Sequence, residues 1–168
     1  MHNLIVARER NPKTIGLISD THGLLRPQAL RALEGSDLII HAGDVGNPEI
    51  LEALKALAPV FAVRGNVDTD PWALALPETE VIETTPATIY VLHDVHALDL
   101  DPVAAGFHII VSGHSHKPSR TEHGGVLFLN PGSAGPRRFD LPVTVARLDV
   151  SQKPWNFNVI DLVNASSK

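Results

Sequence analysis

Cysteine is absent from this chain of 168 residues. Without a thiol the protein forms no disulfide and offers no thiolate to a metal ion. Any metal site must therefore be built from oxygen and nitrogen ligands. A reducing compartment agrees with this composition, and we expect a cytoplasmic location.

The chain also lacks a basic excess and long apolar runs. Its 14 lysine and arginine residues stand against 19 aspartate and glutamate residues, which gives a formal net charge of −5. This balance provides no footprint for long nucleic acid, although a metal site would still attract small anions. No apolar run reaches the length of a membrane span, and the first ten residues are too poor in apolar side chains for a signal peptide. We expect neither long nucleic acid nor a membrane as a partner.

Repeats, low-complexity tracts and dividing linkers are absent as well. The length suits one domain with a full hydrophobic core. We therefore expect a single domain over residues 1–168, of which residues 1–12 form a flexible lead-in. The sequence leaves open whether the chain forms a homo-oligomer.

The first half of the chain alternates apolar runs with helical patterns. The runs at residues 14–19, 37–41 and 60–63 predict buried strands. Helices are predicted at residues 27–34 and 48–58, and each begins at a proline. Apolar strands joined by helices indicate a sheet that is covered on both faces.

The second half reads mainly as strands separated by turn signals such as Gly124-Gly125 and Pro131-Gly132. The expected strands cover residues 80–83, 88–92, 108–112, 119–122, 126–130, 143–150 and 156–160. A short helix is predicted at residues 102–106. Two packed sheets with helices outside fit this order.

Side chains that bind metals follow several of these strands, most of them beside a glycine. They are Asp20, His22, Asp44, Asn66, His93, His114 and His116. Ligands at the exits of parallel strands converge on one edge of a sheet, and a neighbouring glycine lets the backbone turn there. Residues two apart in extended backbone point the same way, so Asp20 with His22, and His114 with His116, can each reach one ion.

Each fragment is weak alone, since Asp-x-His is common and Gly-Asp or Gly-Asn is usually a turn. Two histidines behind Gly113 have fewer structural uses. The ordered set is far stronger than its parts, because oxygen and nitrogen ligands from successive strand ends suit a two-metal hydrolytic site.

Six segments of the chain resemble the calcineurin-like metallophosphoesterase superfamily, and within it the small bacterial and archaeal phosphodiesterases of the YfcE type. In the family's order they are Ile18-Ser-Asp-Thr-His-Gly23, His41-Ala-Gly-Asp-Val45, Arg64-Gly-Asn-Val-Asp68, Leu92-His93, Ser112-Gly-His-Ser-His-Lys-Pro118 and Asn130-Pro-Gly-Ser133. The resemblance implies an α/β fold, a four-layer αββα sandwich in which two mixed β-sheets are flanked by helices.

The resemblance also implies two divalent transition-metal ions in overlapping ligand sets. The first set is Asp20, His22, Asp44 and His116. The second set is Asp44, Asn66, His93 and His114, so that Asp44 bridges. Such nitrogen and oxygen ligation suits Mn, Fe, Zn, Co or Ni better than Mg or Ca, and the resemblance favours manganese.

The expected activity is hydrolysis of small phosphodiesters by in-line attack of a metal-bridging hydroxide. Two divalent ions, two aspartates and one hydroxide leave about one positive charge, which favours an anionic phosphate. Asp44, Asn66 and His93 are expected to take part in the chemistry, and Asn66 would also orient a substrate oxygen. Because histidine must be neutral to bind metal, activity should fall as the pH drops through about 6.

Two positions depart from the family pattern. Many phosphatases of the superfamily carry a histidine, which can protonate the leaving group, where this chain has Val67. His96 and Asp68 are candidates for that acid, and the plainer interpretations are a solvated loop residue and a cap of the following segment. Asp94 follows His93 where glycine is usual, and we keep His93 as a ligand because aspartate tolerates left-handed backbone.

Several alternatives remain open at this stage. Arg137 and Arg138 either bind a substrate phosphate or form salt bridges at the surface or in a dimer. His41 is expected to be a hydrogen-bonded core residue. The competing functions are a phosphomonoesterase, disfavoured by Val67, and a non-catalytic scaffold like the retromer scaffold subunit, which shares the resemblance and the Asn-Pro-Gly-Ser turn. The complete ligand set favours the enzyme.

Overall fold

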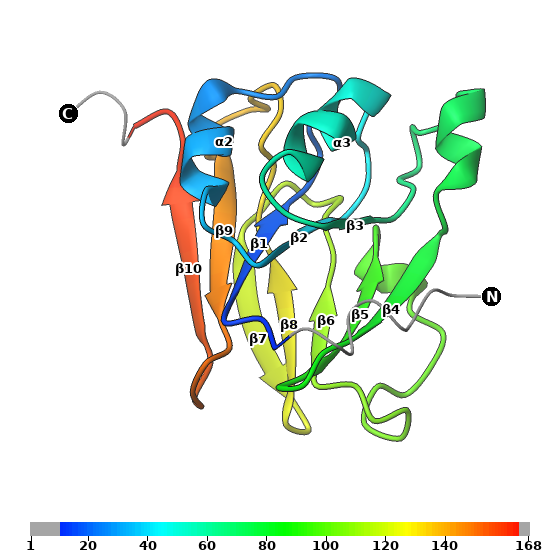
Figure 1. The fold of residues 1–168 in the computed structure, drawn as a ribbon. Helices are drawn as coiled ribbons and strands as arrows, with labels where there is room; N and C mark the ends of the chain where they lie inside the picture. Colours follow the sequence, from blue (N-terminus) through cyan, green and yellow to red (C-terminus); the bar gives the residue numbers. More distant parts are fainter. Residues whose placement is uncertain (1–10, 165–168) are drawn as a thin grey trace.

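The computed structural model describes residues 11–164. The lead-in expected at residues 1–12 therefore lies almost wholly outside the described residues. Two mixed five-stranded sheets face each other (Figure 1). Their strand orders are β10-β9-β1-β2-β3 and β4-β5-β6-β8-β7.

The first sheet combines a parallel half with an antiparallel half. Its strands are β1 (Thr14–Ile18), β2 (Leu38–His41), β3 (Val60–Ala62), β9 (Thr144–Asp149) and β10 (Asn156–Asp161). Strands β1, β2 and β3 run parallel, whereas β9 is antiparallel to β1 and β10. The parallel strands are joined by α2 (Pro27–Leu33) and α3 (Pro48–Lys55), in which proline takes the first helical position.

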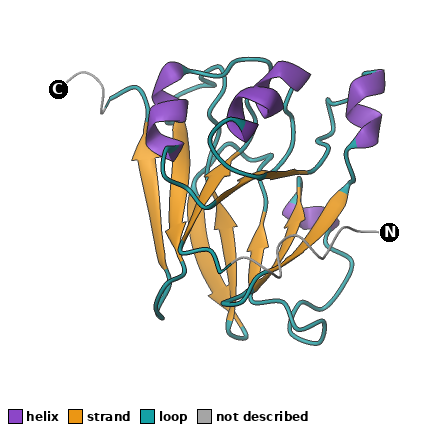
Figure 2. Cartoon of the chain, viewed as in Figure 1, coloured by secondary structure: helices purple, strands orange, loops and turns teal. Residues whose placement is uncertain are grey.

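The second sheet has a parallel centre and antiparallel edges. Its strands are β4 (Thr79–Glu83), β5 (Thr88–Leu92), β6 (Ile109–Val111), β7 (Ser119–His123) and β8 (Val126–Asn130). Strands β5, β6 and β8 run parallel, and β4 and β7 close the two edges. Two short 3-10 helices, η1 (Pro71–Ala75) and η2 (Val95–Ala97), lie in the connections (Figure 2).

Alternating side chains of β1 explain the layering. Ile15 and Leu17 belong to the main cluster between the sheets, and Ile18 packs with α2 and α3 on the other face. Gly16 faces α2 directly, since a Cβ atom there would lie 2.9 Å from Leu33 Cδ2. The missing side chain therefore lets the helix approach the strand.

The outer face of the second sheet has no α-helix among the described residues. Its cluster around Tyr90 and Ile110 is covered by the segment 94–107, in which Phe107 stacks on Tyr90 with ring centroids 4.9 Å apart. The fourth layer is thus formed by η2 and a loop.

The helix predicted at residues 102–106 was wrong. These residues form turns, and the amide N of Phe107 donates to Pro102 O over 3.0 Å. Residues 103–106 are all exposed, so a helix here would bury no apolar face that could stabilise it. The other predicted elements are confirmed, with ends that differ by a few residues. None of the described helices has the length and apolar content needed to cross a membrane.

Candidate metal centre

The predicted ligands follow the carboxyl ends of parallel strands in both sheets. Asp20 and His22 follow β1, Asp44 follows β2 and Asn66 follows β3. In the second sheet His93 follows β5, and His114 and His116 follow β6. The structure brings five of these seven side chains into two metal-type groups.

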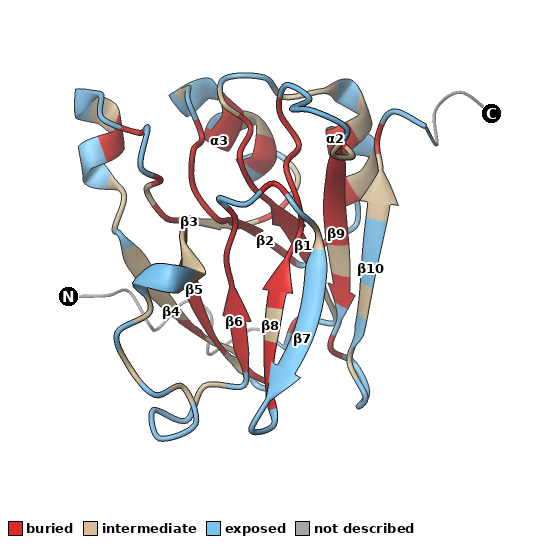
Figure 3. Ribbon diagram, turned by 180° about the vertical axis from the view of Figure 1, so that it is seen from behind, coloured by how far each residue is buried: buried red, intermediate tan, exposed pale blue. Residues whose placement is uncertain are grey.

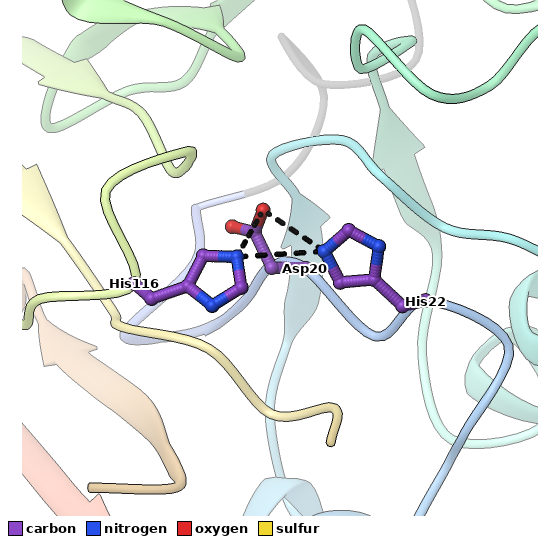
Figure 4. Close-up of side chains that lie close together, drawn as sticks. All are labelled: Asp20, His22 and His116. Carbon is purple, nitrogen blue, oxygen red and sulfur yellow. Dashed lines mark hydrogen bonds and ion pairs between the residues drawn. The ribbon is translucent and has the colours of Figure 1, made fainter. Parts of the chain in front are cut away.

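The first group consists of Asp20, His22 and His116 (Figure 4). Asp20 Oδ1 lies 3.6 Å from His22 Nε2 and 3.3 Å from His116 Nε2. The two imidazole nitrogens lie 3.4 Å apart. One carboxylate oxygen and two ring nitrogens therefore point at a common space.

The second group consists of Asp20, Asp44 and His93. Asp44 Oδ2 lies 3.1 Å from His93 Nε2 and 3.7 Å from His22 Nε2, so this oxygen stands between the two groups. Asp20 Oδ1 is also 3.8 Å from His93 Nε2. Both carboxylates are thus placed between the groups, whereas the sequence interpretation shares only Asp44.

Three buried atoms of this cluster lack a hydrogen-bond partner, namely Asp20 Oδ1, His93 Nε2 and His116 Nδ1. The first two face each other across the space between the groups, at a distance of 3.8 Å. Burial of an unsatisfied carboxylate oxygen is costly, and a cation placed between these atoms would remove the cost. The donor set of carboxylate oxygen and imidazole nitrogen suits a divalent transition metal. The residues present therefore fit the metal that the sequence predicts.

A backbone carbonyl group orients the imidazole ring of His93. Its Nδ1 lies 2.7 Å from the Ala42 carbonyl oxygen, which leaves Nε2 facing the cluster. Burial alone would lower the pKa of His93, but the Asp44 carboxylate, whose Oδ2 lies 3.1 Å from Nε2, raises it. Burial likewise would raise the pKa of Asp44, but the nearby His93 ring and the hydrogen bond from the Val67 amide lower it. A cation that binds here therefore competes with a proton on His93.

The backbone of the ligand loops is left-handed rather than extended. Five predicted ligands have positive φ, namely Asp20 (55°), His22 (48°), Asp44 (56°), His114 (70°) and His116 (62°). The extended geometry assumed for Asp20 and His22 is thus wrong. Instead, their amides donate to Gly43 O and Asp44 O over 2.9 Å each. Such backbone is strained without glycine and concentrates at functional sites.

Two glycines beside the cluster serve close approach. A Cβ atom on Gly43 would lie 2.7 Å from His93 Nδ1, and one on Gly65 would overlap the Asp44 carboxylate. These positions therefore have to stay bare for the ligands to meet.

His114 stands outside the two groups of aspartate and histidine, and Asn66 would supply an amide oxygen in addition to them. Asn66 is exposed, but the next residue donates its amide hydrogen to Asp44 Oδ1 over 3.0 Å. The His114 side chain is 45% exposed, with Nε2 3.8 Å from Asp94 Oδ2. Its ring is 5.1 Å from the ring of His93, and its amide donates to Asp20 Oδ2. His114 therefore borders the cluster, and Asn66 lies between two residues, Gly65 and Val67, that contact Asp44.

Three buried residues hold the ligand loops in place through hydrogen bonds. This role was not predicted from the sequence. His41 Nδ1 accepts from the Gly43 amide at 3.1 Å, and its Nε2 lies 3.0 Å from Thr21 Oγ1. Thr21 in turn donates to Val45 O over 2.8 Å. Ser133 Oγ donates to Asp20 O over 3.1 Å. Burial lowers the pKa of His41 to about 4. The expectation of a hydrogen-bonded core histidine is confirmed.

Asp68 is a loop clamp rather than a cap of the following segment. Its carboxylate accepts from the amides of Val45, Gly46 and Gly65, each at 3.0 Å. The N-cap position before η1 belongs to Asp70. Asp68 thereby ties the loop after β2 to the loop after β3.

Asp94 stands where the family usually has glycine, but the left-handed backbone expected for it is not found. Asp94 has φ −114° and accepts from the His96 amide at the start of η2, so left-handed backbone plays no part. The His96 side chain is 89% exposed and bonds to Asp94 Oδ1 over 3.1 Å. The interpretation of His96 as a solvated loop residue agrees with this exposure.

Residues 14–153 match the model of the calcineurin-like phosphoesterase superfamily domain. The chain belongs to this family. Its sequence is 39% identical over 152 residues to a probable metallophosphoesterase of Methanocaldococcus jannaschii, which covers 83% of this chain and 77% of the relative. It is 29% identical over 162 residues to phosphodiesterase YfcE of Escherichia coli K12, covering 78% and 84% of the two chains. Relatives with these names support a metal-dependent phosphoester hydrolase.

A solved structure with another name shares the fold. A structure of a single mutant of Vps29 from Entamoeba histolytica matches with a TM-score of 0.68 and 26% identity, over 88% of this chain and 98% of the other. Family and fold together therefore leave the function to be argued from the site.

Proposed function

We propose that the chain is a phosphodiesterase that uses two divalent transition-metal ions to hydrolyse small phosphodiesters. The observation that carries the proposal is the pair of buried, unpartnered atoms, Asp20 Oδ1 and His93 Nε2, inside a cluster of five metal-type side chains. Asp20, His22, Asp44 and His116 would hold one ion. Asp44 and His93, with Asn66 and His114 at the border, would hold the other. Manganese is the metal we expect.

When bound, the ions supply Lewis-acid activation of water and of the phosphate. The chain's own residues prepare the place for both. The nearby His93 ring lowers the pKa of Asp44, which favours the ionised carboxylate, and burial lowers the pKa of His116, which favours the neutral ring. The positive charge of Arg138 adds to the lowering of the His116 pKa, so it acts on the cluster. An anionic phosphate would be attracted there, and the exposed Asn66 amide would orient one of its oxygens.

The surroundings of position 67 favour diesters with good leaving groups. Val67 is 50% exposed at the rim and has no proton to donate. Asp68 is 3% exposed and is occupied by three backbone amides, so it is not free to act as the acid. Leaving groups that need no protonation should therefore react best.

The alternative is a non-catalytic scaffold, to which the likeness with Vps29 points. The buried unpaired carboxylate oxygen argues against it, because a surface used only for protein contacts has no need of that costly arrangement.

A matrix of metals and substrates on metal-stripped protein tests the proposal. We expect bis(p-nitrophenyl) phosphate to be hydrolysed with Mn²⁺ and faster than p-nitrophenyl phosphate. Asp20→Asn should lower the rate by about 100-fold or more, because the buried carboxylate is lost. Asp99→Asn, at an exposed site, is the matched control. No turnover of either ester with Mn, Fe, Zn, Co or Ni would favour the scaffold.

A further inference from the structure

A pocket of about 460 Å³ opens beside the metal cluster on the outer face of the second sheet. Figure 3 shows this face, with η2 on one side and the exposed edge strand β7 on the other. Val95 of η2, Thr121 and His123 of β7, and Phe128 of β8 line it, together with His114. We call it the Phe128 pocket.

Strand register explains why its floor is apolar. In the antiparallel pair of β7 and β8, Thr121 lies opposite Phe128 and His123 lies opposite Val126. Val126 is buried in the outer-face cluster, against which Phe128 packs. The His123 ring meets the Phe128 ring edge-on with centroids 5.5 Å apart. The pocket therefore offers an aromatic floor with imidazole at its edge.

The pocket is continuous with the cluster through His114. This residue lines the pocket, its ring is 5.1 Å from that of His93, and its amide bonds to Asp20 Oδ2 over 3.0 Å. Asn130 fixes the loop, because its Nδ2 donates to Gly113 O and Ser115 Oγ. A phosphate at the cluster would thus stand at one end of the pocket.

We infer that the Phe128 pocket receives one ester group of the phosphodiester substrate, and that this group is aromatic and uncharged, such as an aryl group or a nucleoside. This inference rests on the proposed function. The volume falls in the range of about 300–1,000 Å³ found for small-molecule sites, which are mainly apolar with a few polar groups. An aromatic floor binds planar groups by stacking.

The Asp94 carboxylate, which also lines the pocket, selects against a second anionic group. The substrate class that fits is therefore a phosphodiester whose charge lies on the reacting phosphate alone.

Binding of phosphomonoesters to Mn²⁺-loaded full-length protein tests the inference by calorimetry. The wild type should bind 1-naphthyl phosphate at least ~10-fold more tightly than methyl phosphate, because only the naphthyl group fills the pocket. Thr121→Trp should remove this preference and leave the affinity for methyl phosphate unchanged. Ser119→Trp, in the same pocket, is a second variant in case the first is unstable. Glu122→Trp lies on the same strand but lines a different hollow and serves as the control.

The inference is overturned if the wild type shows no preference, or if Thr121→Trp and Ser119→Trp both keep it. Calorimetry measures binding without turnover, so it tests the Phe128 pocket independently of the proposed phosphodiesterase activity. A protein that binds naphthyl phosphate through this pocket but hydrolyses no diester would contradict the phosphodiesterase alone.

Discussion

At the scale of single residues, the predicted ligands differ from ordinary residues in their burial and in their backbone conformation. Asp20 and His93 are buried with one unpartnered atom each, and five of the predicted ligands adopt left-handed backbone. The residue types were predictable from the sequence, because carboxylate and imidazole beside glycine recur after apolar runs. The backbone was not, since it depends on hydrogen bonds between loops, such as the one from the Asp20 amide to Gly43 O.

His41 gives a prediction for stability against pH. Burial holds the pKa of His41 at about 4 in the folded protein, below its ordinary value of 6.5. Between these values the unfolded chain binds the proton more readily, so stability falls as the pH drops from 6.5 towards 4. His41→Gln removes this titration. Chemical denaturation of metal-free protein should show the wild type losing about 2 kcal/mol more than the variant between pH 7 and pH 5.

The difference between the wild type and His41→Gln removes the contributions of the other titrating groups to the pH dependence of stability. One of these groups is His93, whose raised pKa acts in the opposite direction. Equal pH dependence of the two proteins would contradict the account of a buried neutral histidine.

At the scale of elements, the positions of the strands were predictable because the strands are buried. Strands β1 and β2 are covered on both faces and read as continuous apolar runs, which is why the sequence located them. Residues 102–106 show the opposite case, since local composition suggested a helix, but residues 103–106 are exposed and give it no buried apolar face. Asp68 belongs to this scale too, because it joins the loops after β2 and β3 by contacts between residues more than 20 positions apart.

Asp68→Asn tests the clamp. The amide group presents hydrogens to backbone amides that need an acceptor, so at least one buried donor loses its partner. We expect unfolding free energy to fall by about 1–3 kcal/mol and Mn²⁺ to bind more weakly. Asp70→Asn, two residues further and exposed, is the control. If both variants unfold and bind Mn²⁺ alike, the clamp has no role in holding the site.

At the scale of the whole molecule, the cluster forms only where the two sheets meet. Asp20, His22 and Asp44 come from loops of the first sheet, and His93 and His116 come from loops of the second. The sequence predicted that these side chains belong together, because the order of the motifs resembles that of a known family. It did not predict that Asp20 lies between both groups, nor the Phe128 pocket, because both depend on how loops of separate strands pack.

The number of metal ions bound per chain tests the central claim most directly. After equilibrium dialysis against Mn²⁺, elemental analysis of the wild type should find two ions per chain. His93→Ala should retain one, because the first group of Asp20, His22 and His116 stays complete. Asp99→Asn should still bind two. A wild type that binds one ion or none, or a His93→Ala variant that binds two, would contradict the proposed two-metal site.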